Sequence, residues 1–232
     1  MNGWVLLSLL IAHVIGDFYL QSNKYCKLKE KNKFRSPFLY IHSFIVGALS
    51  WVFVPGWSFG IYAAVIFLTH LLTDAIKTYA GRTLWAFMTD QTVHVIILVI
   101  VSCLYTTHNC LPVQYLDFTD TLSIPLLLFA VLCCLKPANI LIKQVLEQYK
   151  IGEAESCNSM KNAGALIGNL ERVLTLAFVI LGQYEAVGFI VAAKTLLRFK
   201  DTDTAKTEYV LAGTLLSVGI SVLFGVAVKL PI

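Results

Sequence analysis

The chain has 232 residues, of which 57% are hydrophobic and only 14% are charged, and its mean hydropathy is +0.73. An average soluble domain carries about 25% charged residues, so this composition excludes a globular protein with a solvated surface and indicates a polytopic membrane protein. The formal net charge is only +4. The basic residues flank apolar segments, which fits lipid head groups better than nucleic acid.

Eight apolar segments are candidates for membrane-spanning helices, each of which needs about 20 mostly apolar residues. They cover about residues 4–20, 38–54, 59–77, 91–107, 121–135, 163–181, 186–197 and 209–228. The seventh is short and is expected as a half-helix or a tilted span, and a re-entrant pair of the sixth and seventh would lower the count. We expect an all-α, polytopic transmembrane helical bundle of about eight spans.

A strongly basic segment follows the first span and sets the expected orientation. It holds Lys24, Lys27, Lys29, Lys31, Lys33 and Arg35. The positive-inside rule places such a loop in the cytoplasm, so the N-terminus is expected outside. Eight spans bring the C-terminus back to that same outer side.

The pattern divides the chain into three parts. These are a five-helix membrane module at 1–135, a cytoplasmic segment at 136–160 and a three-helix membrane module at 161–232. Residues 140–149 are typical of an amphipathic helix on the membrane surface, followed by a linker. We expect membrane lipids as partners, no nucleic acid, and docking of a cytoplasmic protein on residues 22–36 and 137–160; a homo-oligomer is also compatible with the pattern.

Ionisable residues recur in the first four spans. His13, Asp17 and Gln21 are spaced i, i+4 and i+8, so they share one face of a helix. The following three spans add His42, His70, Asp74, Asp90 and His94. Such groups are costly inside a membrane, and the default hypothesis for them is a functional site.

The alternating direction of the spans places these seven His and Asp residues at one level. Each span presents them near its inner end, within roughly the inner 10–12 Å of the bilayer at about 1.5 Å rise per residue. Random placement would scatter them over both leaflets. We therefore expect a shared cluster beneath the cytoplasmic face.

Imidazole and carboxylate groups are the ligand chemistry of zinc, iron and manganese. We expect a divalent metal, zinc before manganese or iron, bound by His13, Asp17, His70, Asp74, Asp90 and His94. One metal with supporting hydrogen bonds, or two metals about 3.5–4 Å apart, would suit this set. Asp17 or Asp90 would act as general base, and His42 as a further ligand or proton shuttle. A polar network without metal and a proton or ion pathway stay open as alternatives.

Other polar residues are candidates for structural or substrate-binding roles. Glu171 is expected to form a structural ion pair with Lys194 or Arg198. Arg172, Lys194 and Arg198 could instead bind a phosphate group. Gln21 and Lys77 lie one turn beyond the His and Asp groups and are candidate substrate ligands, although a lysine there also snorkels to the interface.

Three motifs carry a resemblance to a known family. A-H-x-x-G-D-F-x-x-Q begins at Ala12, H-x-x-x-D at His70 and D-Q-x-x-H at Asp90, with a Lys-rich loop and His42 between them. Over about residues 5–110 the chain resembles the bacterial membrane family called domain of unknown function 3307. The second half is similar to a C-terminal extension of its longer members. A looser similarity to inner-membrane metal-dependent hydrolases implies a hydrolase in a bacterial inner membrane.

The leading expectation is a membrane-embedded, metal-dependent hydrolase that acts on a lipid-like or amphiphilic substrate. Its metal would lower the pKa of a bound water towards 7. A transporter or channel using the same polar cluster is the first alternative, and it predicts polar groups in both leaflets. A non-enzymatic membrane effector is the second alternative, and it predicts that variants of the cluster keep their function.

Overall fold

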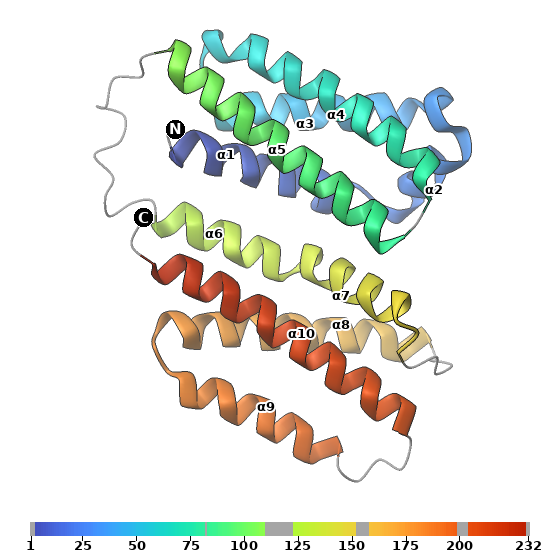
Figure 1. The fold of residues 1–232 in the computed structure, drawn as a ribbon, viewed down its shortest axis with the longest axis vertical. Coiled ribbons are helices and arrows are strands. Elements are labelled where there is room, and N and C mark those ends of the chain that lie inside the picture. Colours follow the sequence, from blue (N-terminus) through green and yellow to red (C-terminus); the bar gives the residue numbers. More distant parts are fainter. Residues whose placement is uncertain (1–2, 82, 110–122, 152–157, 199–203, 231–232) are drawn as a thin grey trace. The chain divides into compact units, whose positions relative to one another are not determined.

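The computed structural model describes residues 3–81, 83–109, 123–151, 158–198 and 204–230. Every regular element in this part of the chain is a helix, which confirms the all-α prediction there. The helices group into two units, Met1–Phe129 and Ala130–Ile232 (Figure 1). The boundary lies inside a helix, so the predicted break at residue 135 differs from the grouping in the structure.

Four long helices form a closed bundle in the first unit. α1 packs against α3 and α5, and α4 packs against the same two helices (Figure 1). The apolar core lies toward the N-terminal end of α1 and includes Val5, Leu9, Phe59, Leu98 and Val101. The elements of the unit are α1 (Gly3–Val14), η1 (Ile15–Tyr19), α2 (Asn23–Asn32), η2 (Lys33–Arg35), α3 (Pro37–Phe53), η3 (Trp57–Phe59), α4 (Gly60–Ala80) and α5 (Leu84–His108).

Two glycines allow the helices that carry the ionisable residues to approach closely. A Cβ on Gly47 of α3 would lie 2.9 Å from the Cβ of Phe67 on α4. A Cβ on Gly16 of η1 would lie 2.8 Å from Cγ2 of Val46 on α3. Both separations are below van der Waals contact, so larger residues would push these helices apart.

The second unit is arranged around α10, which packs against α7, α8 and α9. Its core contains Ala130, Cys134 and Leu176, with Ile220 and Phe224 packed beside them. The elements are α6 (Ser123–Cys134), which crosses the boundary between the units, α7 (Lys136–Gln148), α8 (Asn158–Ile180), α9 (Tyr184–Arg198) and α10 (Thr204–Lys229).

α6 and α7 together form one candidate membrane span, Ile124–Gln148. We expected an amphipathic helix at residues 140–149, and α7 covers most of this range, with Lys143 and Glu147 paired on its exposed face. α7 follows α6 directly and groups with the second unit. Pro137 is tolerated because it lies in the first turn of α7, where a backbone N–H is not needed. Arg172 Nε donates to the carbonyl of Cys134, which closes the break between the helices. Residues 152–157 of the predicted linker lie outside the described residues.

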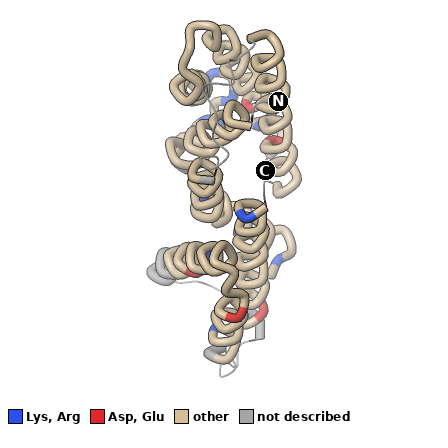
Figure 2. Tube along the Cα trace, turned by 90° about the vertical axis from the view of Figure 1, so that its left-hand side faces the viewer, with Lys and Arg blue, Asp and Glu red and all other residues tan. Residues whose placement is uncertain are grey.

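Four helices in the described part of the chain are long and apolar enough to cross a membrane, which fits a membrane protein. They are Trp57–Ala80, Leu84–His108, Ile124–Gln148 and Thr207–Lys229, and a fifth span results if the bent pair Gly3–Tyr19 and Lys24–Arg35 counts as one. The predicted eight spans are not supported. α3 has only 17 residues and α9 only 15, and α8 begins with a polar stretch. Charged positions are sparse along the helices (Figure 2).

Candidate metal centre

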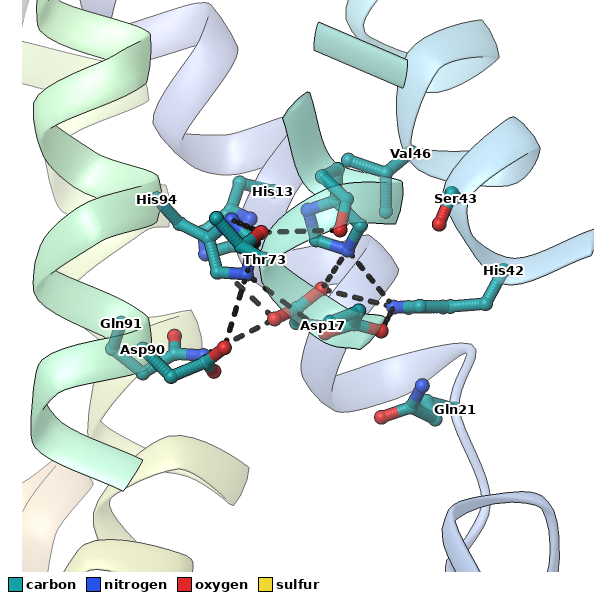
Figure 3. Close-up of polar contacts among 12 residues, drawn as sticks. His13, Asp17, Gln21, His42, Ser43, Val46, Thr73, Asp90, Gln91 and His94 are labelled. Carbon is teal, nitrogen blue, oxygen red and sulfur yellow. Dashed lines mark hydrogen bonds and ion pairs between the residues drawn. The ribbon is translucent and has the colours of Figure 1, made fainter. Parts of the chain in front are cut away.

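The structure brings the seven His and Asp residues of the first four predicted spans together inside the first unit. None of their side chains is more than 7% exposed. Figure 3 shows the side chains converging from η1 and the surrounding helices onto one region. The cluster consists of His13, Asp17, His42, His70, Asp74, Asp90 and His94.

A π-helical turn follows α1 and separates Gln21 from His13 and Asp17. Asp17 lies in this turn, Ile15–Tyr19, and π-turns often mark functional sites. The helix ends there, so Gln21 leaves the face that it was expected to share with His13 and Asp17. Gln21 Oε1 instead accepts a hydrogen bond from Cys26 Sγ at 3.3 Å, and its side chain points away from the other groups (Figure 3).

Three ligand atoms form a nearly equilateral triangle, which we call centre A. His42 Nε2 and His70 Nε2 are 3.1 Å apart, and each lies 3.2 Å from Asp17 Oδ1. Ligands held tetrahedrally at about 2.0–2.1 Å from a zinc ion are about 3.3 Å from one another. Asp74 Oδ2, which is 3.7 Å from His42 Nε2, is a candidate fourth ligand. Centre A therefore has the dimensions of a tetrahedral metal site.

Hydrogen bonds cannot satisfy all three contacts of centre A. Each imidazole nitrogen carries at most one proton, and a carboxylate oxygen carries none when ionised. His42 Nε2 and His70 Nε2 can therefore supply at most two protons for three contacts. Whatever the tautomers, one contact places two lone pairs or two N–H groups against each other. A cation inside the triangle would interact favourably with all three atoms.

A second group of ligand atoms surrounds His94. Its Nε2 lies 3.4 Å from Asp90 Oδ1 and 3.9 Å from Asp74 Oδ1. Thr73 Oγ1 lies 3.3 Å from Nδ1 of the same ring, and the ring stacks on His70 with centroids 4.2 Å apart. These contacts fix the ring so that its Nε2 faces the two carboxylates.

Two lysines bind the carboxylates of the cluster: Lys77, which was expected as a substrate ligand, and Lys29, which was not predicted at all. Lys77 Nζ donates to Asp90 Oδ2 at 2.5 Å, and Lys29 Nζ donates to Asp74 Oδ2 at 2.5 Å. Lys29 belongs to α2, which we expected to be part of a loop. α2 turns by 86° away from the preceding helix, and its Lys29 is only 7% exposed. The basic segment therefore contributes directly to the cluster.

Gln91 is a further polar contact that sequence reasoning did not assign. Its Nε2 donates to Asp17 Oδ2 at 3.2 Å and to Asp90 Oδ2 at 3.1 Å. The motif D-Q-x-x-H contains this residue, so its place beside Asp90 was a signal that could have identified it. Gln91 joins the carboxylates of η1 and α5.

The polar residues predicted in the second half lie in the second unit. Lys194 Nζ and Glu171 Oε2 form an ion pair at 2.6 Å, which is one of the two expected pairings. Arg198 is the last residue of α9, and its side chain lies outside the described residues.

Arg172 is 2% exposed and donates to four protein acceptors. Nη1 donates to Ser217 Oγ at 3.1 Å, and Nη2 donates to the side-chain oxygens of Asn139 and Asn169 at 2.5 and 2.7 Å. The Nε donates to the Cys134 carbonyl. Its guanidinium is thus engaged inside the unit rather than presented to a phosphate.

A family model, described as Protein of unknown function (DUF3307), matches residues 5–122. The chain belongs to this family. The matched segment of the DUF3307 chain contains all seven residues of the cluster, together with Lys29, Lys77 and Gln91. No curated protein and no solved structure matches the chain. The family description assigns no activity, so only the geometry of the site bears on function.

Proposed function

We propose that the chain is a membrane-embedded, metal-dependent hydrolase whose centre A binds a divalent cation. Zinc is the first candidate, with manganese and iron as alternatives. The observation that carries this proposal is the triangle of His42 Nε2, His70 Nε2 and Asp17 Oδ1, whose contacts hydrogen bonds cannot all satisfy. Two imidazoles and one carboxylate form a ligand set of zinc hydrolases, and a water would complete it where Asp74 stays bound to Lys29 or where the ion takes five ligands.

The geometry divides the proposed catalytic roles among the residues. A bound divalent cation lowers the pKa of its water towards 7 and so supplies a nucleophile. Asp17 and His42 point into centre A, which favours them as ligands rather than as general base and proton shuttle. Asp90 Oδ1 lies outside centre A and makes no hydrogen bond within the described residues. With a metal in centre A alone, this oxygen is the better candidate for the general base, a role that it loses where it binds a second cation.

The surroundings of the cluster support a site near the cytoplasmic leaflet of a bacterial inner membrane. Lys24, Lys27 and Lys31 on α2 are exposed, and α2 also provides Lys29 to the cluster. The aromatic side chains of Tyr79 and Trp85 are 57% and 72% exposed near the same ends of α4 and α5. Exposed lysines and aromatic rings are typical of a cytoplasmic membrane interface. An amphiphilic substrate with an anionic head group would fit there.

The orientation in the membrane, the number of spans and the binding partners are also part of this proposal. The basic helix α2 faces the cytoplasm, and the N-terminus lies on the outer side of the membrane. For the C-terminus to lie on the outer side too, the chain must cross the membrane an even number of times. Besides the four candidate spans, the eight-span arrangement would need α1 with η1, α3, α8 and α9 to cross as well. Docking of a cytoplasmic protein on residues 22–36 and 137–160, and a homo-oligomer, stay predictions.

The opposite half of the first unit favours hydrolysis over transport. A transport pathway would need polar groups beyond the cluster toward the other leaflet. The described side chains there form an apolar core that includes Phe59, Leu98 and Val101. The small cavity next to His13, His70 and His94 has a volume of about 10 Å³, which is near the lower limit for holding one water molecule.

Elemental analysis of detergent-purified protein tests this proposal. We expect a divalent metal in the wild type and its loss in His70→Ala and Asp74→Ala. The matched control is His108→Ala, which changes an exposed histidine at the end of α5 and keeps the metal. Chromogenic p-nitrophenyl esters and phosphodiesters, with and without a chelator, report hydrolysis by the same proteins. A wild type without metal, or hydrolysis that survives both chelation and the two variants, would contradict the proposal.

A further inference from the structure

Centre A uses only part of the ligand atoms in the cluster. His94 Nε2, Asp90 Oδ1 and Asp74 Oδ1 lie beside it and form a second set, which we call centre B. His94 Nε2 is 3.4 Å from the Asp90 oxygen and 3.9 Å from the Asp74 oxygen. One ligand atom from each of Asp17, Asp90 and His94 also lies within 4.8 Å of the others. Each of these oxygens therefore lies within reach of a cation that His94 Nε2 would bind.

Two buried atoms beside centre B have no hydrogen-bond partner among the described residues. Asp90 Oδ1 makes no hydrogen bond although the residue is 7% exposed. His13 Nε2 is equally without one, although the residue is only 3% exposed. A buried polar atom without a partner costs about 1–3 kcal/mol. A cation in centre B would satisfy Asp90 Oδ1. His13 Nε2 lies 3.9 Å from Asp17 Oδ2, and its ligand atoms group with those of Asp17 and His70.

Two carboxylates link the centres because each turns its two oxygens in different directions. Asp17 Oδ1 belongs to centre A, whereas its Oδ2 faces His13 and accepts from Gln91. Asp74 Oδ2 faces His42 of centre A at 3.7 Å, whereas its Oδ1 faces His94 at 3.9 Å. A carboxylate placed in this way can bridge two ions, and paired catalytic metals lie about 3.5–4 Å apart.

We infer that the cluster binds two divalent cations, one in centre A and one in centre B, bridged by Asp17 and Asp74. This inference rests on the proposed function and deepens it. The three carboxylates carry three negative charges, so two divalent cations leave a net charge of +1 before Lys29 and Lys77 are counted. The loaded site is thus positive, which suits a two-ion clamp on an anionic substrate such as a phosphoester.

Full-length protein in detergent, stripped with a chelator and reloaded with Mn²⁺, tests the inference. We expect two Mn²⁺ per chain and an electron paramagnetic resonance spectrum of an exchange-coupled pair. Asp90→Asn and His94→Ala should each retain one Mn²⁺, in centre A, with the spectrum of an isolated ion. His108→Ala is the matched control and should keep the coupled pair.

The possible results separate this inference from the proposed function. One Mn²⁺ per chain in the wild type, or two ions without coupling, would overturn the bridged pair and leave a hydrolase with one metal. Two coupled ions in Asp90→Asn and His94→Ala would also overturn the assignment of centre B. A wild type that binds no divalent metal would overturn both proposals. The wild-type measurement decides even where a variant fails to fold.

Discussion

Each unit of the molecule buries a polar cluster, but the two clusters are completed in opposite ways. In the second unit, Arg172 directs its donors at a carbonyl, a hydroxyl and two amide oxygens. In the first unit, three carboxylates and four imidazoles face one another, and Lys29 and Lys77 neutralise only two of the three negative charges. The four Arg172 hydrogen bonds all end on protein acceptors, whereas Asp17 of the first cluster has no lysine partner among the described residues.

This difference indicates that the Arg172 network is structural and that the His and Asp cluster is a binding site. Buried polar groups in native proteins are almost always hydrogen-bonded, and exceptions call for an explanation such as an ion. The Arg172 network meets this rule inside the protein and joins α6, α7, α8 and α10. In the His and Asp cluster, Asp90 Oδ1 and His13 Nε2 make no hydrogen bond within the described residues, although they lie 3.4 Å from His94 Nε2 and 3.9 Å from Asp17 Oδ2, respectively. Its geometry is explained by a ligand that brings positive charge.

Arg172→Met gives the largest expected effect on folding and tests the structural half of this comparison. The substitution leaves the Cys134 carbonyl and the Asn139 oxygen without their donor, at about 1–3 kcal/mol for each buried acceptor. We expect a loss of about 3 kcal/mol in the free energy of unfolding, measured by denaturation in detergent, and an unchanged metal content. Glu171→Gln is the control, because its partly exposed ion pair contributes about 1 kcal/mol or less. If Arg172→Met lost its metal while its free energy of unfolding stayed at the wild-type value, metal binding would depend on the Arg172 network.

Helical periodicity and span direction were enough to predict the membership of the His and Asp cluster. Spacing at i, i+4 fixes the helix face, as in His70 and Asp74, and the alternating direction of successive helices fixes the level. Gln21 was misplaced because a π-helical turn interrupts the regular repeat after His13. Periodicity carries no information about such a local irregularity.

The other differences arise from tertiary contacts that a single segment does not reveal. In the sequence, Lys29 is one of several lysines that are expected in solvent. It reaches Asp74 because α2 turns by 86° from the preceding helix. The union of α6 with α7 depends on Arg172, which lies about 40 residues further along the chain. Only four or five of the eight predicted spans are supported in the described residues, because α3 and α9 are shorter than a full span, as their apolar segments already were in the sequence.

Gln91→Leu tests whether the unpredicted hydrogen bonds support the metal centre. Gln91 orients Asp17 and Asp90 from outside, and loss of such an orienting partner typically costs 10–100-fold in metal affinity. We expect a decrease of about that size with the fold unchanged, measured by competition with a fluorescent chelator. Gln183→Leu, which changes an exposed glutamine of the second unit, should have no effect. Unchanged affinity in Gln91→Leu would assign these hydrogen bonds to folding alone.

Lys29→Met has the smallest expected effect and the opposite sign. The ammonium group of Lys29 and a metal ion compete for the same oxygen, Asp74 Oδ2. Removing the ammonium frees this oxygen and lowers the positive charge beside the metal, so we expect about tenfold tighter binding, or ~1.4 kcal/mol. The metal-free variant should unfold at a lower temperature, because Asp74 then lacks its buried partner. Lys27→Met, at an exposed position of the same helix, should change neither quantity. Weaker metal binding in Lys29→Met would mean that Lys29 supports the metal-binding conformation of Asp74 instead of competing for it.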